Sequence, residues 1–178
     1  PAFPKALDGQ EVEGRRFMLS ELVTFKYFVG RLSLLNSDYP AAEEKLSFAF
    51  EHCPARRFKN KRLILRSLVP VRVALGAYPT RELLQKYRLL HFVPVCRSVH
   101  RGDLRAFDAV LEQHQRTFIR QGSYLLLERS KMIAYRNFFK RIRDLHPEGK
   151  QLKLDVRRFQ SCLAAAGVSM DVDEIECV

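Results

Sequence analysis

Apolar residues recur every three to four positions between residues 24 and 54, which is the spacing of one helical face. The first run of apolar residues comprises Phe25, Phe28, Val29, Leu32 and Leu35. A polar Asn-Ser-Asp turn interrupts the pattern, and a second run follows. The inward side of that second run is Ala42, Leu46, Ala49 and Phe50. The pattern therefore predicts a helical hairpin with helices over residues 19–36 and 40–52.

The hairpin resembles a tetratricopeptide repeat. Pro40 stands where the first turn of a helix accepts proline. Gly30 takes the small position of the repeat's first helix, and Pro54 takes its closing position. Lys26 occupies the position at which the repeat has Trp, so the match is partial.

Further helices follow at unequal spacing. One is predicted over residues 63–75, with Pro70 kinking it and Gly76 ending it. Corners, meaning tight turns between consecutive helices, are predicted at two places. One is Tyr78-Pro79, where Pro79 starts a helix as Pro40 does, and the other is Arg101-Gly102-Asp103-Leu104. A long helix is predicted over residues 125–142, and its apolar face comprises Leu126, Ile133, Phe138 and Ile142. The expected fold class is all-α, an irregular TPR-like helical solenoid.

The pattern changes after residue 149. Residues 151–154 alternate as a short strand does, Asp155 can cap a helix that ends at Gly167, and acidic residues start another helix after Met170. This order is typical of the front half of a winged-helix module, whose hairpin wing we expect beyond Val178. The predicted domains are a lead-in over residues 1–18, TPR-like helical repeats over 19–122, and an incomplete winged-helix subdomain over 123–178.

Composition predicts a folded chain, and net charge restricts the expected classes of partner. The chain has 178 residues, and its hydrophobic content of 47% predicts that it folds. Its formal net charge of +11 favours polyanions or acidic proteins as partners. The candidate nucleic-acid contacts are Arg56, Arg57, Lys59, Lys61 and Arg62 in a first basic cluster, and Lys140, Arg141, Lys153, Arg157 and Arg158 in a second. An ordinary solvated loop between repeats remains the alternative for the first cluster.

The sequence contains no motif for catalysis. The four cysteines Cys53, Cys96, Cys162 and Cys177 form no CxxC pair and are typical of reduced thiols in a nuclear or cytosolic protein. No phosphate loop, HExxH or GxSxG sequence is present. Apolar runs fall short of the roughly 20 residues of a membrane span. We therefore predict no enzyme activity, no metal, no cofactor and no membrane partner.

Five strings carry a family resemblance: Thr24 to Arg31, Ala42-Glu43-Glu44, Leu46 to Cys53, Lys59 to Arg62, and Tyr135-Arg136-Asn137. They are similar to the PCI family, which is found in the proteasome lid, the COP9 signalosome and an initiation-factor complex. Within that family, the strings most resemble the PCI subunit of the nuclear transcription-and-export (TREX-two type) complex for mRNA export and its COP9-associated relative. The likeness extends from about residue 19 to residue 178.

The resemblance implies a non-catalytic scaffold subunit of a nuclear mRNA-export complex. Its implied partners are a larger Sac/GANP-type scaffold that joins through adjoining winged helices, a small acidic DSS/Sem-type protein on the solenoid, and RNA or DNA on a basic platform. Its implied location is the nucleus, including the nuclear pore, with some protein in the cytoplasm. The alternative is a protein-only PCI scaffold of another complex, COP9-associated or splicing-linked, that binds an acidic partner peptide.

Overall fold

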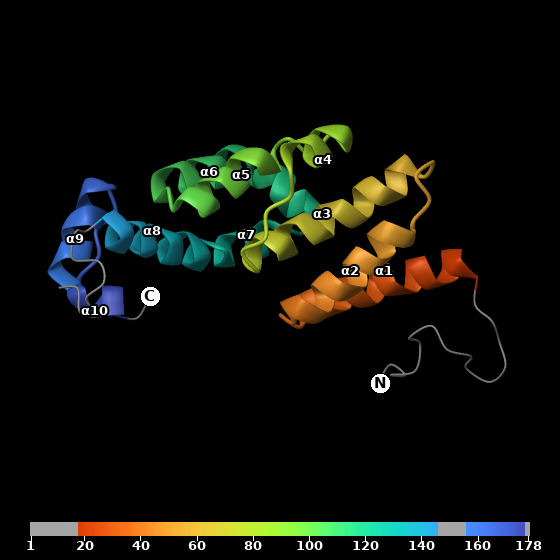
Figure 1. Ribbon diagram of the computed structural model, residues 1–178, viewed down its shortest axis with the longest axis horizontal. Coiled ribbons are helices and arrows are strands. Elements are labelled where there is room, and N and C mark those ends of the chain that lie inside the picture. The colour runs from red at the N-terminus through yellow and green to blue at the C-terminus, as the bar shows by residue number, and fades with distance from the viewer. Residues whose placement is uncertain (1–17, 146–155, 177–178) are drawn as a thin grey trace. The chain divides into compact units, whose positions relative to one another are not determined.

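The computed structural model describes residues 18–145 and 156–176 (Figure 1), and every regular element in these ranges is an α-helix. The helices are α1 (Leu19–Leu35), α2 (Tyr39–His52), α3 (Phe58–Ala74), α4 (Arg81–Lys86), α5 (Phe92–Arg101), α6 (Leu104–Gln121), α7 (Tyr124–Arg129), α8 (Lys131–Leu145), α9 (Val156–Ala165) and α10 (Val172–Glu176). This confirms the all-α fold class. The predicted strand over residues 151–154 lies outside the described residues.

Two compact units make up the chain, Pro1–Val71 and Arg72–Val178, and the boundary between them falls within α3. The two units are defined by how compactly each part of the chain packs, so they do not test whether a winged-helix subdomain starts at residue 123. The predicted division into repeats and winged helix, with its lead-in over residues 1–18, stays a prediction.

The first unit contains the predicted hairpin, with α1 beside α2 (Figure 1). The Asp38 side chain caps α2, because its Oδ1 accepts a hydrogen bond from the Ala41 amide at 3.1 Å. Leu46 is fully buried against α1. A Cβ at Gly30 would lie 2.8 Å from Leu46 Cγ, so only glycine lets the two helices come this close without a shift.

The buried face of α1 differs from the predicted apolar stripe. Phe28 is 60% exposed and Leu35 is 82% exposed, whereas the buried residues of α1 are Val23, Lys26, Tyr27 and Gly30. Leu46 of α2 packs against the face of α1 that bears Gly30, because the missing Cβ permits this close approach. Lys26 therefore lies inward at the Trp position of the repeat, with its ammonium 5.6 Å from the centre of the Phe48 ring.

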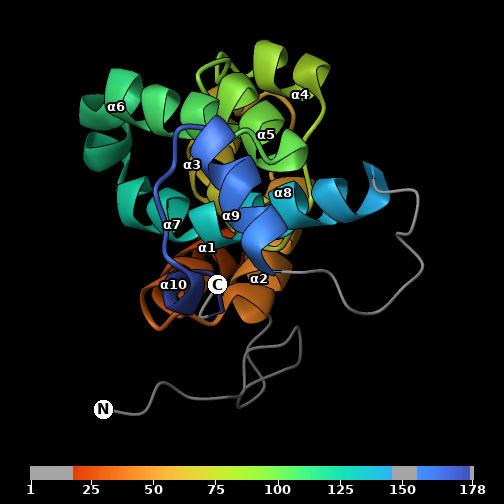
Figure 2. The ribbon, with the colours of Figure 1, turned by 90° about the vertical axis from the view of Figure 1, so that its left-hand side faces the viewer.

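In the second unit, α5 packs against both α6 and α8 (Figure 1, Figure 2). The predicted corner between α5 and α6 is confirmed. Gly102 ends α5 in the left-handed conformation with φ of +65°, and the Asp103 side chain caps α6 through a 3.0 Å hydrogen bond from the Ala106 amide. A Cβ at Gly102 would collide with the backbone of Asn137 and Phe138 in α8. The corner and α8 are therefore in direct backbone contact.

Asn137 connects three parts of this unit. Its side-chain amide donates to the Val99 carbonyl at 2.8 Å and to the Tyr78 hydroxyl at 3.3 Å, which joins α8 to the end of α5 and to the segment between α3 and α4. Burial raises the pKa of the Tyr78 hydroxyl, and the hydrogen bond from Asn137 opposes that shift. Burial also raises the pKa of the nearby Cys96 thiol to about 12, so this thiol is neutral at physiological pH.

Three predicted boundaries need correction. Pro79 does not start a helix as Pro40 does, because Thr80 caps α4 through its hydroxyl and α4 begins at Arg81. The predicted helix over residues 125–142 is divided into α7 and α8 at Ser130, whose hydroxyl and backbone amide both donate to the Leu126 carbonyl, at 2.9 and 3.1 Å. α3 begins at Phe58, five residues before the predicted start. The kink at Pro70 stays a prediction.

Other local predictions are confirmed. Gly76 follows the last helical residues of α3 with φ of +78°, and Gly167 follows α9 with φ of +74°. The acidic start of α10 forms a capping box, in which the Glu174 amide donates to Asp171 Oδ1 at 2.7 Å and the Asp171 amide donates to Glu174 Oε2 at 2.9 Å.

The contact between Gly30 and Leu46 predicts energetic coupling between the two positions. Gly30→Ala gains about 1 kcal/mol of helix propensity, but it displaces a fully buried Leu46 at a cost of about 1–3 kcal/mol. Leu46→Ala alone costs about 2–5 kcal/mol. In the double variant the new methyl group meets no leucine, so we expect the double variant to be more stable than the sum of the single changes by about 1 kcal/mol or more. Urea unfolding of the four proteins measures this coupling, and additive free energies would contradict the contact.

Candidate nucleic-acid interface

The first basic cluster lies between α2 and the first turns of α3. The side chains of Arg56, Arg57 and Lys59 are exposed there. Arg56 and Arg57 precede α3, and Lys59 lies in its first turn, where the unpaired amides of the helix add partial positive charge. These three side chains therefore present positive charge to solvent at one corner of the first unit.

Lys61 and Arg62 belong to the same cluster but are half-buried. The Lys61 ammonium donates to the Phe50 carbonyl at 2.8 Å and lies 4.5 Å from the centre of the Phe50 ring. That carbonyl belongs to the last turn of α2, where a helix lacks internal donors. Lys61 therefore joins the end of α2 to the start of α3, in addition to any role in binding.

The second basic cluster belongs to the second unit. Lys140 and Arg141 are exposed on α8, and Arg157 and Arg158 are exposed in the first turn of α9. Lys153 lies outside the described residues. The rings of Phe139 and Phe159 meet edge to face at 5.1 Å, which holds α8 and α9 together beneath these charges.

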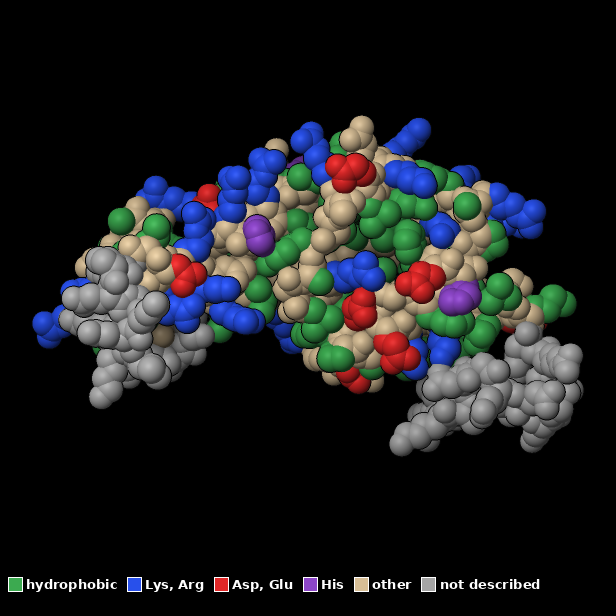
Figure 3. Space-filling model, in the orientation of Figure 1, with side chains coloured by type: hydrophobic (Ala, Val, Ile, Leu, Met, Phe, Trp, Pro, Cys, Tyr) green, Lys and Arg blue, Asp and Glu red, His purple; other side chains and the backbone are tan. Residues whose placement is uncertain are grey.

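Charge is distributed unevenly over the face of the molecule seen in Figure 3. Lys and Arg side chains gather there over α5, α6 and α8, whereas Asp and Glu side chains gather over α1 and α2. Basic residues beyond the two predicted clusters therefore contribute to the positive surface of the second unit.

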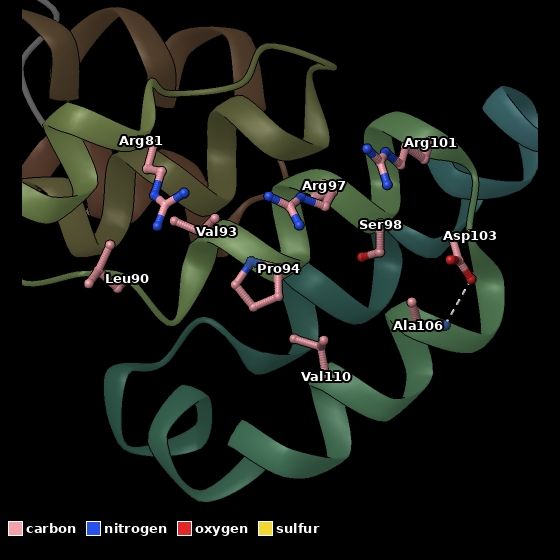
Figure 4. A pocket seen from close by; sticks show the side chains of 10 residues that line it. All are labelled: Arg81, Leu90, Val93, Pro94, Arg97, Ser98, Arg101, Asp103, Ala106 and Val110. Carbon is pink, nitrogen blue, oxygen red and sulfur yellow. Dashed lines mark hydrogen bonds between the residues drawn. The ribbon is translucent and has the colours of Figure 1, made fainter.

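The structure adds an arginine-rimmed groove that the sequence did not reveal (Figure 4). Its volume is about 470 Å³, and Arg81, Arg97 and Arg101 form its rim. Its apolar floor consists of Leu90, Val93, Pro94, Ala106 and Val110. We call these eight residues the arginine groove. The available sequence signal was the four-residue step from Arg97 to Arg101, which places both side chains on one face of α5.

A second hollow of about 320 Å³ shares Arg101 with this groove. Arg105 and Arg141 also line it, above the apolar side chains of Phe138 and Ile142. Arg141 donates to the Arg101 carbonyl at 2.8 Å, and the Arg105 guanidinium lies directly over Gly167, so these two arginines also connect helices. Of the predicted nucleic-acid contacts that the structure describes, only Arg141 lines either hollow.

Residues 18–145 and 156–176 show neither a metal site nor a membrane span. No three His, Cys, Asp or Glu side chains in these ranges gather closely enough to hold a metal ion. None of the helices in these ranges has the length and apolar character that crossing a membrane requires.

Comparison with known proteins identifies clear relatives, although no family model matches the chain. The chain is 42% identical to PCI domain-containing protein 2 of Xenopus laevis over 98% of its own length and 43% of the relative's. It is 40% identical to the Danio rerio protein of the same name, over 98% of this chain and 43% of the relative. It is 35% identical to Enhanced ethylene response protein 5 of Arabidopsis thaliana, over 91% of this chain and 40% of the relative. The chain therefore spans about two fifths of the length of these relatives.

The contacts of Lys61 predict that it stabilises the first unit more than its exposed neighbour does. We expect Lys61→Ala to lower the free energy of unfolding by about 1 kcal/mol, because it removes one hydrogen bond and one cation–π contact. Lys59→Ala is the matched control and should change stability by less than about 0.5 kcal/mol. Denaturant unfolding of both variants checks the difference, and equal values would show that the Lys61 contacts contribute nothing.

Proposed function

Because the chain belongs to the PCI-domain family, we propose that it is a scaffold segment of a nuclear mRNA-export complex that holds protein partners and presents basic clusters to RNA or DNA. PCI-domain proteins are generally non-catalytic scaffolds. The observation that carries the nucleic-acid part is the exposed group of Arg56, Arg57 and Lys59 at the start of α3. Exposed guanidinium and ammonium groups beside a helix N-terminus suit phosphate oxygens.

The two basic clusters support binding that is independent of base sequence. Arg and Lys side chains that contact phosphates position a protein on a nucleic acid without reading its bases. Such contacts release counterions, so affinity falls steeply as salt concentration rises. We propose that the exposed residues of both clusters act in this way, with Lys61 contributing mainly to the structure of the corner.

Exposed apolar residues support the protein-binding part. On α1, Phe28, Leu32 and Leu35 recur at helical spacing and are exposed. An apolar stripe of this kind is typical of a surface that contacts another protein. The proposed partners are a larger Sac/GANP-type scaffold and a small acidic DSS/Sem-type protein, and the proposed location is the nucleus, including the nuclear pore, with some protein in the cytoplasm.

A second candidate function is favoured by the arginine groove. Its apolar floor has no use in phosphate contact but suits a peptide. This candidate is a protein-only PCI scaffold of another complex, COP9-associated or splicing-linked, that binds an acidic partner peptide. It differs from the first candidate in predicting no nucleic-acid affinity for the assembled complex.

Charge reversal tests the nucleic-acid part. In the full-length protein assembled with its partners, we expect R56E/R57E/K59E combined with K140E/R157E/R158E to weaken binding of single-stranded RNA at low salt by at least about tenfold. The salt dependence of log affinity should also become shallower, by about 0.7 for each phosphate that the variant no longer neutralises. Fluorescence anisotropy with labelled RNA over a range of salt concentrations measures both quantities.

The control is R116E/R120E, which reverses two exposed charges on α6 outside both clusters and both hollows. It should leave the affinity for RNA within about threefold of the wild type, because only long-range electrostatics change. If the combined cluster variant bound RNA at low salt as tightly as the wild type does, the protein-only scaffold would be the better explanation.

A further inference from the structure

We propose that Ser161 on α9 is a phosphorylation site for an arginine-directed protein kinase, and that its phosphate offsets the charge of Arg157 and Arg158. The second part rests on the proposed function, because it requires that these two arginines contact nucleic acid. The first part is independent of that function. Together the two parts add regulation of the second basic cluster by a reversible modification.

The sequence before Ser161 is typical of the substrates of arginine-directed kinases. Arg158 precedes Ser161 by three positions and Arg157 precedes it by four. Kinases of this class bind a substrate arginine three positions before the acceptor hydroxyl, and such charge patterns contribute to the choice of substrate. Among the serines and threonines that the structure describes, only Ser123 and Ser161 have an arginine at this position.

Exposure distinguishes Ser161 from Ser123. Ser123 is 4% exposed, and its hydroxyl donates to the Phe118 carbonyl at 3.4 Å within the fold. Ser161 is exposed, and its hydroxyl donates to the Arg157 carbonyl at 3.0 Å on the surface of α9. Water can replace an exposed hydrogen bond of this kind at little cost. Of these two serines, Ser161 is therefore the one that a kinase can reach.

A kinase binds its substrate in an extended conformation, so α9 has to open locally. The helix has ten residues, fewer than the roughly 12–15 below which an isolated helix is marginal in water. It lies at one end of the second unit, beside α8 and α10 (Figure 1). Leu163 is its one buried residue, and Gln160 joins it to the Met170 carbonyl through a 3.2 Å hydrogen bond. Few buried contacts therefore oppose the opening.

The reaction is a phosphoryl transfer from ATP. A bond forms between Ser161 Oγ and the γ-phosphorus, and the bond from that phosphorus to the oxygen that bridges to the β-phosphate breaks. ADP leaves, and the hydroxyl proton passes to the catalytic aspartate of the kinase. The product side chain has a charge of about −1.5 to −2 at pH 7. The reaction thus converts a neutral hydroxyl into a strongly anionic group.

The phosphate forms within reach of both arginines. Residues three and four positions apart are neighbours on a helix surface, and Arg157, Arg158 and Ser161 are all exposed on α9. Contacts between guanidinium groups and phosphate are charge-assisted and strong. The second basic cluster has four cations in the described part of the chain, namely Lys140, Arg141, Arg157 and Arg158. A phosphate with a charge near −2 offsets about half of their charge.

The first experiment measures phosphorylation of the full-length protein. It uses γ-labelled ATP and the catalytic domain of a calmodulin-dependent protein kinase, which selects arginine three positions before the acceptor. Mass spectrometry should place the label at Ser161, and S161A should lose it. We expect R158A to slow labelling by at least about tenfold. R157A removes the adjacent exposed arginine and should slow it less than about threefold, and S169A, which removes another exposed serine, should leave the rate unchanged.

The second experiment measures RNA binding by the full-length protein assembled with its partners. Phosphorylation of Ser161 should weaken binding of single-stranded RNA at low salt by about threefold or more. The salt dependence of log affinity should become shallower by up to about 1.4, which is about 0.7 for each of two arginines. S161A taken through the same kinase reaction is the control and should keep the affinity of the untreated protein. Phosphatase treatment should restore the affinity of the phosphorylated protein.

Two results would overturn the phosphorylation site: no label at Ser161, or equal labelling rates for R158A and R157A. Circular dichroism confirms that each variant is folded. The charge-reversal variant K140E/R157E/R158E separates the remaining outcomes. If phosphorylation left RNA affinity unchanged while this variant bound RNA weakly, the regulatory part would be wrong and the proposed function would stand. If this variant also bound RNA as tightly as the wild type, the contribution of the second cluster to the proposed function would fail, and the phosphorylation site would remain.

Discussion

The close approach of α8 to the corner between α5 and α6 determines the arrangement of the second unit. Gly102 permits it, because any Cβ there would collide with the α8 backbone. Side chains of α8 donate to carbonyls in the last turn of α5: Asn137 donates to the Val99 carbonyl, which also accepts from the Gly102 amide, and Arg141 donates to the Arg101 carbonyl. With its C-terminus fixed in this way, α5 holds Val95 and Val99 in the core while Arg97 and Arg101 remain exposed.

The proposed scaffold has two kinds of surface. The exposed lysines and arginines at the start of α3 and on α8 and α9 lie on open surface, as contacts to a phosphate backbone require. The arginine groove combines charge with an apolar floor, as recognition of an amphipathic segment requires. Because different residues form the two surfaces, one PCI-family chain could hold an acidic partner segment and a nucleic acid at the same time.

Local features of the fold were predictable from the sequence, and features that depend on packing were not. Asp38, Asp103 and Gly102 mark helix ends through interactions with residues a few positions away, so their roles follow from short strings. The buried face of α1 depends on how closely Gly30 can approach Leu46, and counting apolar residues missed it. Two further features depend on how separate elements pack. They are the hydrogen bond from Lys61 to the Phe50 carbonyl and the position of Arg81 and Arg97 at the rim of one groove.

Nucleic acid and an acidic segment are proposed to occupy separate surfaces of one scaffold, and hydrogen–deuterium exchange of the full-length protein can distinguish those surfaces. Exchange is measured for the protein free, with single-stranded RNA, with an acidic amphipathic peptide, and with both. We expect the peptide to slow exchange in α5 and the first turns of α6, and RNA to slow it around residues 56–62 and in α8 and α9. Both effects should persist when the two ligands are present together. Protection of the same amides by either ligand, or loss of one pattern when the other ligand is added, would contradict separate surfaces.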